Sequence, residues 1–296
     1  MWSVLRSRPV YTFSAQSRAI ISPKTIASKN ICVRFASGAP TSAPKAKENE
    51  IRIHHLGVGA DIYIHPSKLP SFFTSPRLRF RGFVRLAKTF ALNTLQVAMF
   101  RFRSGLKPRF VEWKNEALKT YVEVNEAFTN KNLAPVDKKI CLWVNEALSS
   151  RIKSLPKNTD FRWKLLKVTS PPKLMNFQYM MLPNYPPTVA QVTYRLETKQ
   201  RLVRSKHGER EPIVVDRDVT DYVSFMIDAS TVPSEVMMLG TVFETPLNGA
   251  MPIVSEKESD AIASMVEKGD VFRASPKDIT FQEAKEIMKS QGDNKA

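Results

Sequence analysis

Acidic residues are missing from two long stretches of this chain. None occurs before Glu48, and none occurs between Asp61 and Glu112. The chain as a whole has a formal net charge of +17 and a pI of about 9.9, so the rest of the sequence does not offset these stretches. A charge of this size predicts contact with a polyanion, either a phosphate backbone or anionic lipid headgroups, and carries no information about the fold.

Cysteine, glycine and the common catalytic motifs are also scarce. Cys32 and Cys141 form no CxxC pair, so we expect neither a disulfide nor a zinc site. His54, His55 and His65 have no cysteine or carboxylate cluster nearby, which favours loop residues over metal ligands. The ten glycines form no phosphate-binding loop, and HExxH and GxSxG are absent. We therefore expect no cofactor, no small-molecule substrate and no enzyme.

Residues 1–36 have the composition of a mitochondrial transit peptide. Their basic residues are spaced among Ser, Thr and Ala, and arginines together with Pro9 interrupt the apolar run that a secretory signal would need. The run from Val33 to Gly38 is typical of a matrix-processing site, so we expect cleavage between Arg34 and Gly38. The alternative is a disordered basic tail. Residues 37–76 are predicted to be a linker followed by irregular chain with at most one short strand.

Helical periodicity precedes strand periodicity in the rest of the chain. Apolar spacing predicts helices near 82–104, 109–131 and 135–155, and alternation predicts strands near 161–168, 173–182, 188–201, 214–227 and 236–244. This order predicts an α+β domain over residues 77–246, with a mostly antiparallel sheet. Residues 247–296 are rich in Lys and Glu and are predicted to form a charged, partly helical C-terminal tail.

Basic and aromatic side chains are mixed throughout the second acid-free stretch. Nine basic residues are candidates for binding RNA or lipid: Arg77, Arg79, Arg81, Arg85, Lys88, Arg101, Arg103, Lys107 and Arg109. We expect Arg77, Arg79 and Arg81 to alternate along an extended chain and so to share one side. The alternative is a solvated face. The uncharged run from Thr89 to Phe100 spans about 18 Å as a helix, short of a bilayer core, so this helix is either buried or lies in a membrane interface, with peripheral attachment.

The segment from Trp163 to Val168 has two interpretations. Its indole can stack on a base while the two lysines hold phosphates, or the indole can lie in the core, as expected for Trp113 and Trp143. The apolar phase of all three tryptophans favours the core.

One carboxylate cluster has a chemical interpretation as well as a structural one. Asp216, Asp218 and Asp221 can be imagined as a general base beside Tyr194 or Tyr222. The arginine within this run instead favours solvated charge on a loop or an edge strand, which deters edge pairing.

The order of these features resembles a known family. Helices carrying Phe110, Tyr121 and Ala127, a helix from Pro135 and a sheet containing ValThrTyrArgLeu follow the basic segment. They are similar to the family of the C-terminal domain of the mitochondrial import motor's membrane anchor, over about residues 60–245. Within that family the chain looks closest to fungal membrane-associated mitoribosome receptors, whose animal relative is a protein of the large mitoribosomal subunit. The resemblance implies helices on the concave side of a twisted sheet, cone-like and with a pocket.

The resemblance also implies a function. It predicts a receptor, peripheral on the matrix side of the mitochondrial inner membrane, that tethers the large ribosomal subunit and supports co-translational insertion. Its expected partners are ribosomal RNA and proteins near the exit tunnel, anionic lipid, and an inner-membrane insertase. The import-motor anchor's long charged N-terminal domain has no counterpart in the short linker, which argues against the motor role. The alternatives are a structural component or assembly factor of the large subunit, and an enzyme using the pocket.

Overall fold

The structure, a computed structural model, describes residues 53–59, 62–67, 69, 71–73, 75–156, 158–182, 185–206, 211–247 and 258–275. The predicted leader and its cleavage site lie outside the described residues, as do the polar linker and the end of the C-terminal tail.

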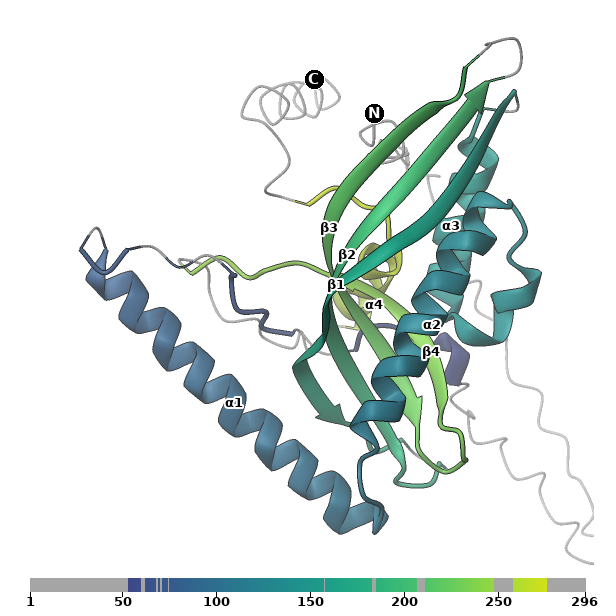
Figure 1. Ribbon diagram of the computed structural model, residues 1–296. Helices are drawn as coiled ribbons and strands as arrows, with labels where there is room; N and C mark the ends of the chain where they lie inside the picture. Colours follow the sequence, from purple (N-terminus) through teal and green to yellow (C-terminus); the bar gives the residue numbers. More distant parts are fainter. Residues whose placement is uncertain are drawn as a thin grey trace, which may run out of the picture.

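A four-stranded antiparallel sheet forms the centre of the domain (Figure 1). Its strands are β1 (Thr159–Tyr179), β2 (Val189–Lys206), β3 (Ile213–Asp228) and β4 (Glu235–Val242), paired in chain order. Alternating apolar and polar residues give the sheet one face for the core. The predicted α+β class with an antiparallel sheet is confirmed.

β1 is one strand of 21 residues, where the sequence predicts two strands divided at Pro171 and Pro172. That division is wrong. Four register irregularities in the pairing with β2 absorb the extra residues of β1. The prolines are tolerated because β1 is an edge strand, where an N–H group on the open side needs no strand partner.

Three α-helices precede the sheet. They are α1 (Pro76–Ser104), α2 (Phe110–Thr129) and α3 (Leu142–Ser154), with the short 3₁₀ turns η2 (Ile53–His55) and η3 (Ala134–Lys139). α1 begins at Pro76 rather than near Gly82, since proline suits a first helical turn, whose N–H groups have no intrahelical partner. The single helix predicted from Pro135 is interrupted, because Ile140 forms a parallel bridge to Met238 between η3 and α3.

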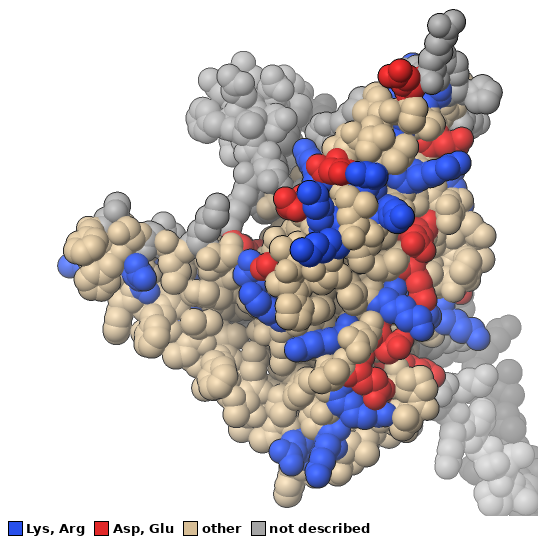
Figure 2. Space-filling model, viewed as in Figure 1, with Lys and Arg blue, Asp and Glu red and all other residues tan. Residues whose placement is uncertain are grey.

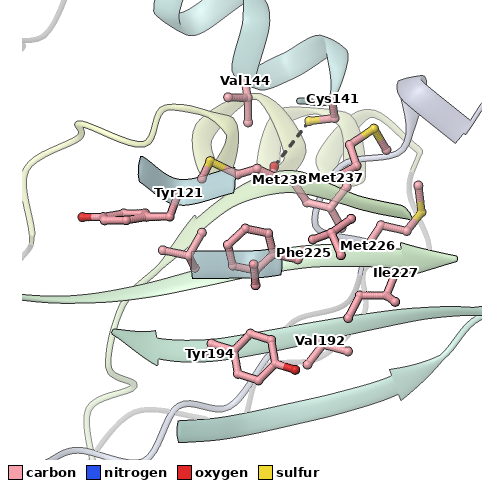
Figure 3. Close-up of a cluster of buried hydrophobic side chains, with 14 of the residues drawn as sticks. Tyr121, Cys141, Val144, Val192, Tyr194, Phe225, Met226, Ile227, Met237 and Met238 are labelled. Atoms are coloured by element: carbon pink, nitrogen blue, oxygen red, sulfur yellow. Dashed lines mark hydrogen bonds between the residues drawn. The ribbon is translucent and has the colours of Figure 1, made fainter. Parts of the chain in front are cut away.

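Helices cover one face of the sheet and α1 runs along its β1 edge (Figure 1). We call the face toward α2 the inner face and the opposite face the outer face. The apolar stripe of α2, which includes Trp113, Tyr121 and Phe128, is buried as predicted. Figure 3 shows Tyr121 in one cluster with Val144 of α3 and Phe225 of β3. Much of the core therefore lies between the helices and the inner face, while residues 189–194 of β2 are buried on both faces.

α4 (Glu258–Gly269) packs against α3 and β4. The buried guanidinium of Arg151 donates to both carboxylate oxygens of Asp270, at 2.6 Å each. Gly240 of β4 has a φ of +142°, and a Cβ there would lie 2.1 Å from the carbonyl oxygen of Lys268, so only glycine allows this approach. α4 is the helical part of the segment predicted as a tail, and these contacts hold it on the domain.

Candidate functional site

The side of α1 that faces away from the sheet is apolar. Phe80, Phe83, Phe90 and Phe102 are 69%, 64%, 72% and 86% exposed, and we call them the α1 apolar face. At 100° per residue they fall within about 120° of arc around the helix axis. Figure 2 shows this side of the molecule as mostly uncharged. A contiguous exposed apolar patch of this kind marks a binding surface rather than a core.

Basic residues border the α1 apolar face. Arg77, Arg81 and Lys88 lie along one border by helical phase, and Arg79 lies along the other. Arg79 is about 160° from Arg77 around the axis. The prediction that Arg77, Arg79 and Arg81 share one side is therefore wrong, because α1 starts at Pro76 and makes this segment helical rather than extended.

Seven of the nine predicted polyanion-binding residues are exposed: Arg77, Arg79, Arg81, Lys88, Arg101, Arg103 and Lys107. The other two hold the fold together. The guanidinium of Arg85 donates to the carbonyl oxygen of Pro246 at 3.4 Å. The guanidinium of Arg109 donates to Ser234 Oγ at 2.9 Å and pairs with Glu112 at 3.2 Å. The structure thus groups the first four exposed residues along α1 and the last three at its C-terminal end.

Side-chain amides on the opposite side of α1 fasten it to the sheet. Asn93 Nδ2 donates to the Met175 carbonyl oxygen, and Asn93 Oδ1 accepts from the Phe177 N–H, both at 3.1 Å. Gln96 Oε1 accepts from the Tyr179 N–H at 3.1 Å. These bonds replace a strand partner on the open edge of β1. The role of Asn93 and Gln96 in fastening α1 was not predicted, although two amides inside a mostly apolar helical run are a signal for it.

A small cavity lies between α2, the inner face and the residues that follow α4. Its walls include Tyr121, Asp221 and Phe272, and its volume of about 20 Å³ suits about one water molecule. The Tyr121 hydroxyl donates to Asp221 Oδ2 at 2.6 Å and accepts from Gln200 Nε2 at 2.8 Å. Burial, with the nearby Asp221 carboxylate, raises the pKa of Tyr121 well above its ordinary value. The phenol therefore stays protonated and serves as a structural bridge.

The carboxylates considered as a general base do not converge. Asp216 and Asp218 pair with β2 residues of the outer face, whereas Asp221 faces the inner side. Asp216 accepts two hydrogen bonds from Arg201, at 2.7 and 2.8 Å, which lower the pKa of Asp216. A general base at neutral pH needs a raised pKa. Tyr222 instead donates to Glu244 at 2.8 Å on the outer side.

Trp163 lies in the core, and its Nε1 donates to Gln200 Oε1 at 2.9 Å. The indole is therefore closed to base stacking, and the core interpretation is confirmed. Lys164 and Lys167, however, are exposed on the other side of the sheet. The stacking half of the RNA-binding hypothesis is thus wrong for this segment, and the phosphate-binding half stays a prediction.

Within the part of the chain that the structure describes, no three His, Cys, Asp or Glu side chains are grouped as metal ligands. His54 and His55 are exposed in η2, and His65 Nδ1 lies 3.3 Å from the Tyr63 hydroxyl. No described helix has both the length and the apolar content that crossing a membrane requires.

The fold and the α1 surface define a class of protein, an α+β domain with an exposed apolar helix face bordered by basic residues. The chain belongs to the MBA1-like protein family, whose model matches residues 42–277. A relative from Saccharomyces cerevisiae, named inner membrane mitoribosome receptor MBA1, mitochondrial, is 39% identical over 235 residues, which cover 78% of this chain and 84% of the relative. The resemblance to the fungal mitoribosome receptors is thereby confirmed.

Proposed function

We propose that this chain is a mitochondrial ribosome receptor, attached peripherally to the matrix side of the inner membrane. It tethers the large ribosomal subunit there and so supports co-translational insertion of mitochondrially encoded proteins. Membership of the MBA1-like family supports the role in ribosome binding. The single observation that carries the membrane part is the α1 apolar face with its basic borders.

The α1 apolar face suits the interface between headgroups and acyl chains. Each phenylalanine that leaves water there contributes about 2 kcal/mol. Each arginine or lysine beside an anionic headgroup contributes about 1 kcal/mol. Because the Asn93 and Gln96 bonds already hold α1 on the sheet, little ordering entropy is lost on binding. A helix lying in the interface needs no membrane span.

Tethering requires a second surface that remains open when α1 is in lipid. In Figure 1 the long ends of β1, β2 and β3 extend away from α1. With α1 in the interface, these strand ends point into the matrix, where a bound ribosome lies. An inner-membrane insertase beside the bound ribosome is a further proposed partner.

A flotation assay tests this proposal. Salt-washed large mitoribosomal subunits, the full chain and cardiolipin-containing vesicles are mixed and centrifuged through a density gradient. Subunits should float with the vesicles only when the protein is present. The double variant Phe83→Ser/Phe90→Ser should lose most of the flotation, because both side chains lie in the α1 apolar face. Val266→Ser, at an exposed apolar residue of α4 that lies in neither the α1 apolar face nor the long strand ends, is the matched control and should leave it intact.

Two outcomes would contradict the proposal. If the α1 double variant floats as well as the wild type, α1 does not contact the lipid. Subunits that stay at the bottom while the protein floats would remove the tethering role. In mitochondria, salt that dissociates ribosomes should leave the protein with the membrane. A protein that follows the large subunit through a salt-washed gradient would instead be a structural component of that subunit.

A further inference from the structure

A second basic surface lies on the outer face of the sheet. Four exposed basic residues of β1 form it, and we call them the β1 basic row: Arg162, Lys164, Lys167 and Lys173. Their partners on β2 are, in order, Val203, Arg201, Lys199 and Arg195. These partners are all odd-numbered positions of β2, whose register with β3 has no shift. The four basic residues of β1 therefore lie on the same face of the sheet.

The irregularities of β1 create this alignment. Lys164 and Lys167 are three residues apart and would point to opposite faces of a regular strand. The register shift between Leu165 and Lys167 turns Lys167 back to the side of Lys164. Lys173 is six residues beyond Lys167, and the two further shifts between Val168 and Lys173 cancel, so Lys173 stays on that side. Bulges at sheet edges commonly redirect side chains in this way, and they are features of a fold rather than defects.

The carboxylates of the outer face neutralise β2 and leave β1 positive. Arg201 is held by Asp216 through two hydrogen bonds, and Arg195 pairs with Glu197 at 2.5 Å. Within the described residues, no carboxylate lies within ion-pair distance of a member of the β1 basic row, and the one electrostatic contact is that of Lys173 with Glu197, whose pKa it helps to lower. Positive charge therefore rises across the sheet from β3, which carries Asp216 and Asp218, to the open edge at β1.

We infer that the β1 basic row binds the phosphate backbone of RNA. The row covers eight residue steps on β2, or about 27 Å, which is far longer than one small anion and suits a run of phosphates. Phosphate contacts of this kind fix the position of a protein on RNA without reading its sequence. This inference rests on the proposed ribosome receptor and names the surface that would meet ribosomal RNA.

Composition separates this surface from the lipid-binding one. Large apolar side chains are nearly absent from the exposed part of β1, where Leu166 is 37% exposed, whereas Phe90 of α1 is 72% exposed. Figure 2 shows basic side chains together with acidic ones over the long strands, in contrast to the mostly uncharged α1 side. A headgroup interface draws in apolar side chains, while a phosphate backbone does not. The two surfaces can therefore be occupied at the same time.

Charge reversal tests the assignment on the full chain. The triple variant Arg162→Glu/Lys164→Glu/Lys167→Glu removes three candidate phosphate contacts. A control triple variant, Lys119→Glu/Lys138→Glu/Lys153→Glu, makes the same change of net charge at exposed lysines on the helical side. Binding is measured against salt-washed large subunits, protein-free large-subunit RNA and cardiolipin vesicles over a salt series. Thermal unfolding followed by circular dichroism checks that each variant folds.

The β1 variant should bind subunits and protein-free RNA at least about tenfold more weakly, and its salt dependence should be flatter by about one unit per lost contact. Its vesicle binding, and all binding of the control, should match the wild type. A folded β1 variant that binds subunits normally overturns the inference. A variant that loses only vesicle binding also overturns it, because the row would then bind lipid. A variant that loses binding to whole subunits but still binds protein-free RNA overturns it as well, because the row would then contact a ribosomal protein. If the wild-type chain binds no subunits, the proposed receptor function itself fails.

Discussion

α1 and α2 both carry aromatic residues at helical spacing, yet the structure uses them in opposite ways. α2 buries its stripe, with Trp113 at 0% exposure, while α1 buries only Gly82 and Phe100 and leaves four phenylalanines in the α1 apolar face outside. α1 is longer, at 29 residues against 20, so its exposed side is not simply a fraying end. Apolar periodicity identifies a helix, but other information is needed to tell which side of the helix packs against the rest of the domain.

The distribution of acidic residues provides that information. The outer side of α2 carries Glu112, Glu116, Glu123 and Glu126, which are the residues expected on a solvated helix face. α1 has no carboxylate, and its exposed side combines phenylalanine with arginine and lysine. Water favours the first composition, and an anionic interface favours the second. The absence of acids in the sequence thus coincides with the helix side for which we propose a lipid partner.

The largest expected effect comes from truncating one aromatic residue in each helix. Trp113→Ala should lower the free energy of unfolding by about 3 to 5 kcal/mol, because it leaves a cavity beside Phe100, Phe110 and Phe177. Phe90→Ala should change it by no more than about 0.5 kcal/mol and should instead weaken vesicle binding. Urea denaturation and vesicle flotation measure the two quantities. Equal destabilisation by the two variants would mean that α1 packs against the domain on its phenylalanine side.

A smaller effect separates two buried phenols. Tyr121→Phe removes the bridge between Asp221 and Gln200 and should lower the free energy of unfolding by about 1 to 3 kcal/mol. The Tyr194 hydroxyl is buried and has no hydrogen-bond partner among the described residues. Tyr194→Phe should therefore be neutral or slightly stabilising. If urea denaturation ranks these variants in the reverse order, the Tyr121 network does not have the structural role assigned to it.

The smallest effect concerns the inner side of α1. Asn93→Ala removes the bonds to Met175 and Phe177 on the β1 edge and should lower the free energy of unfolding by about 1 kcal/mol. Hydrogen exchange is the sharper measurement, since the Phe177 amide loses its acceptor and should exchange faster. Thr94→Ala, one position along on an exposed part of α1, is the control and should leave that amide protected. Unchanged exchange at Phe177 in Asn93→Ala would show that α1 is held by other contacts.

Much of the fold could be predicted, because local periodicity and burial agree in α2, β2 and β3. Trp113 and Tyr121 fall on one stripe of α2, and the pairing of β2 with β3 has no register shift, so local pattern and strand position stay in step. Long β1 could not be predicted, because its bulges arise from pairing with β2 and hide the alternation. The interruption before α3 likewise depends on the bridge from Ile140 to the distant Met238.

The candidate sites were only partly accessible from the sequence. The basic, acid-free stretch pointed to a polyanion-binding segment, but the sides on which its residues lie follow from the helix start at Pro76. The β1 basic row was obscured further, because Lys164 and Lys167 have the wrong spacing for one face of a regular strand. Sequence patterns report local geometry well, whereas a surface assembled by strand register appears only once the partner strand is known.

The most direct test of the two-surface account is to ask which surface enters the membrane. A fluorescent label is placed on Phe90→Cys or on Lys164→Cys, in a chain that also carries Cys32→Ser. The remaining Cys141 is buried and its pKa is raised to about 11, so it should not react. With cardiolipin vesicles containing a lipid quencher, the account predicts strong quenching at position 90 and none at position 164. Bound protein with no quenching at position 90, or with equal quenching at both positions, would contradict it.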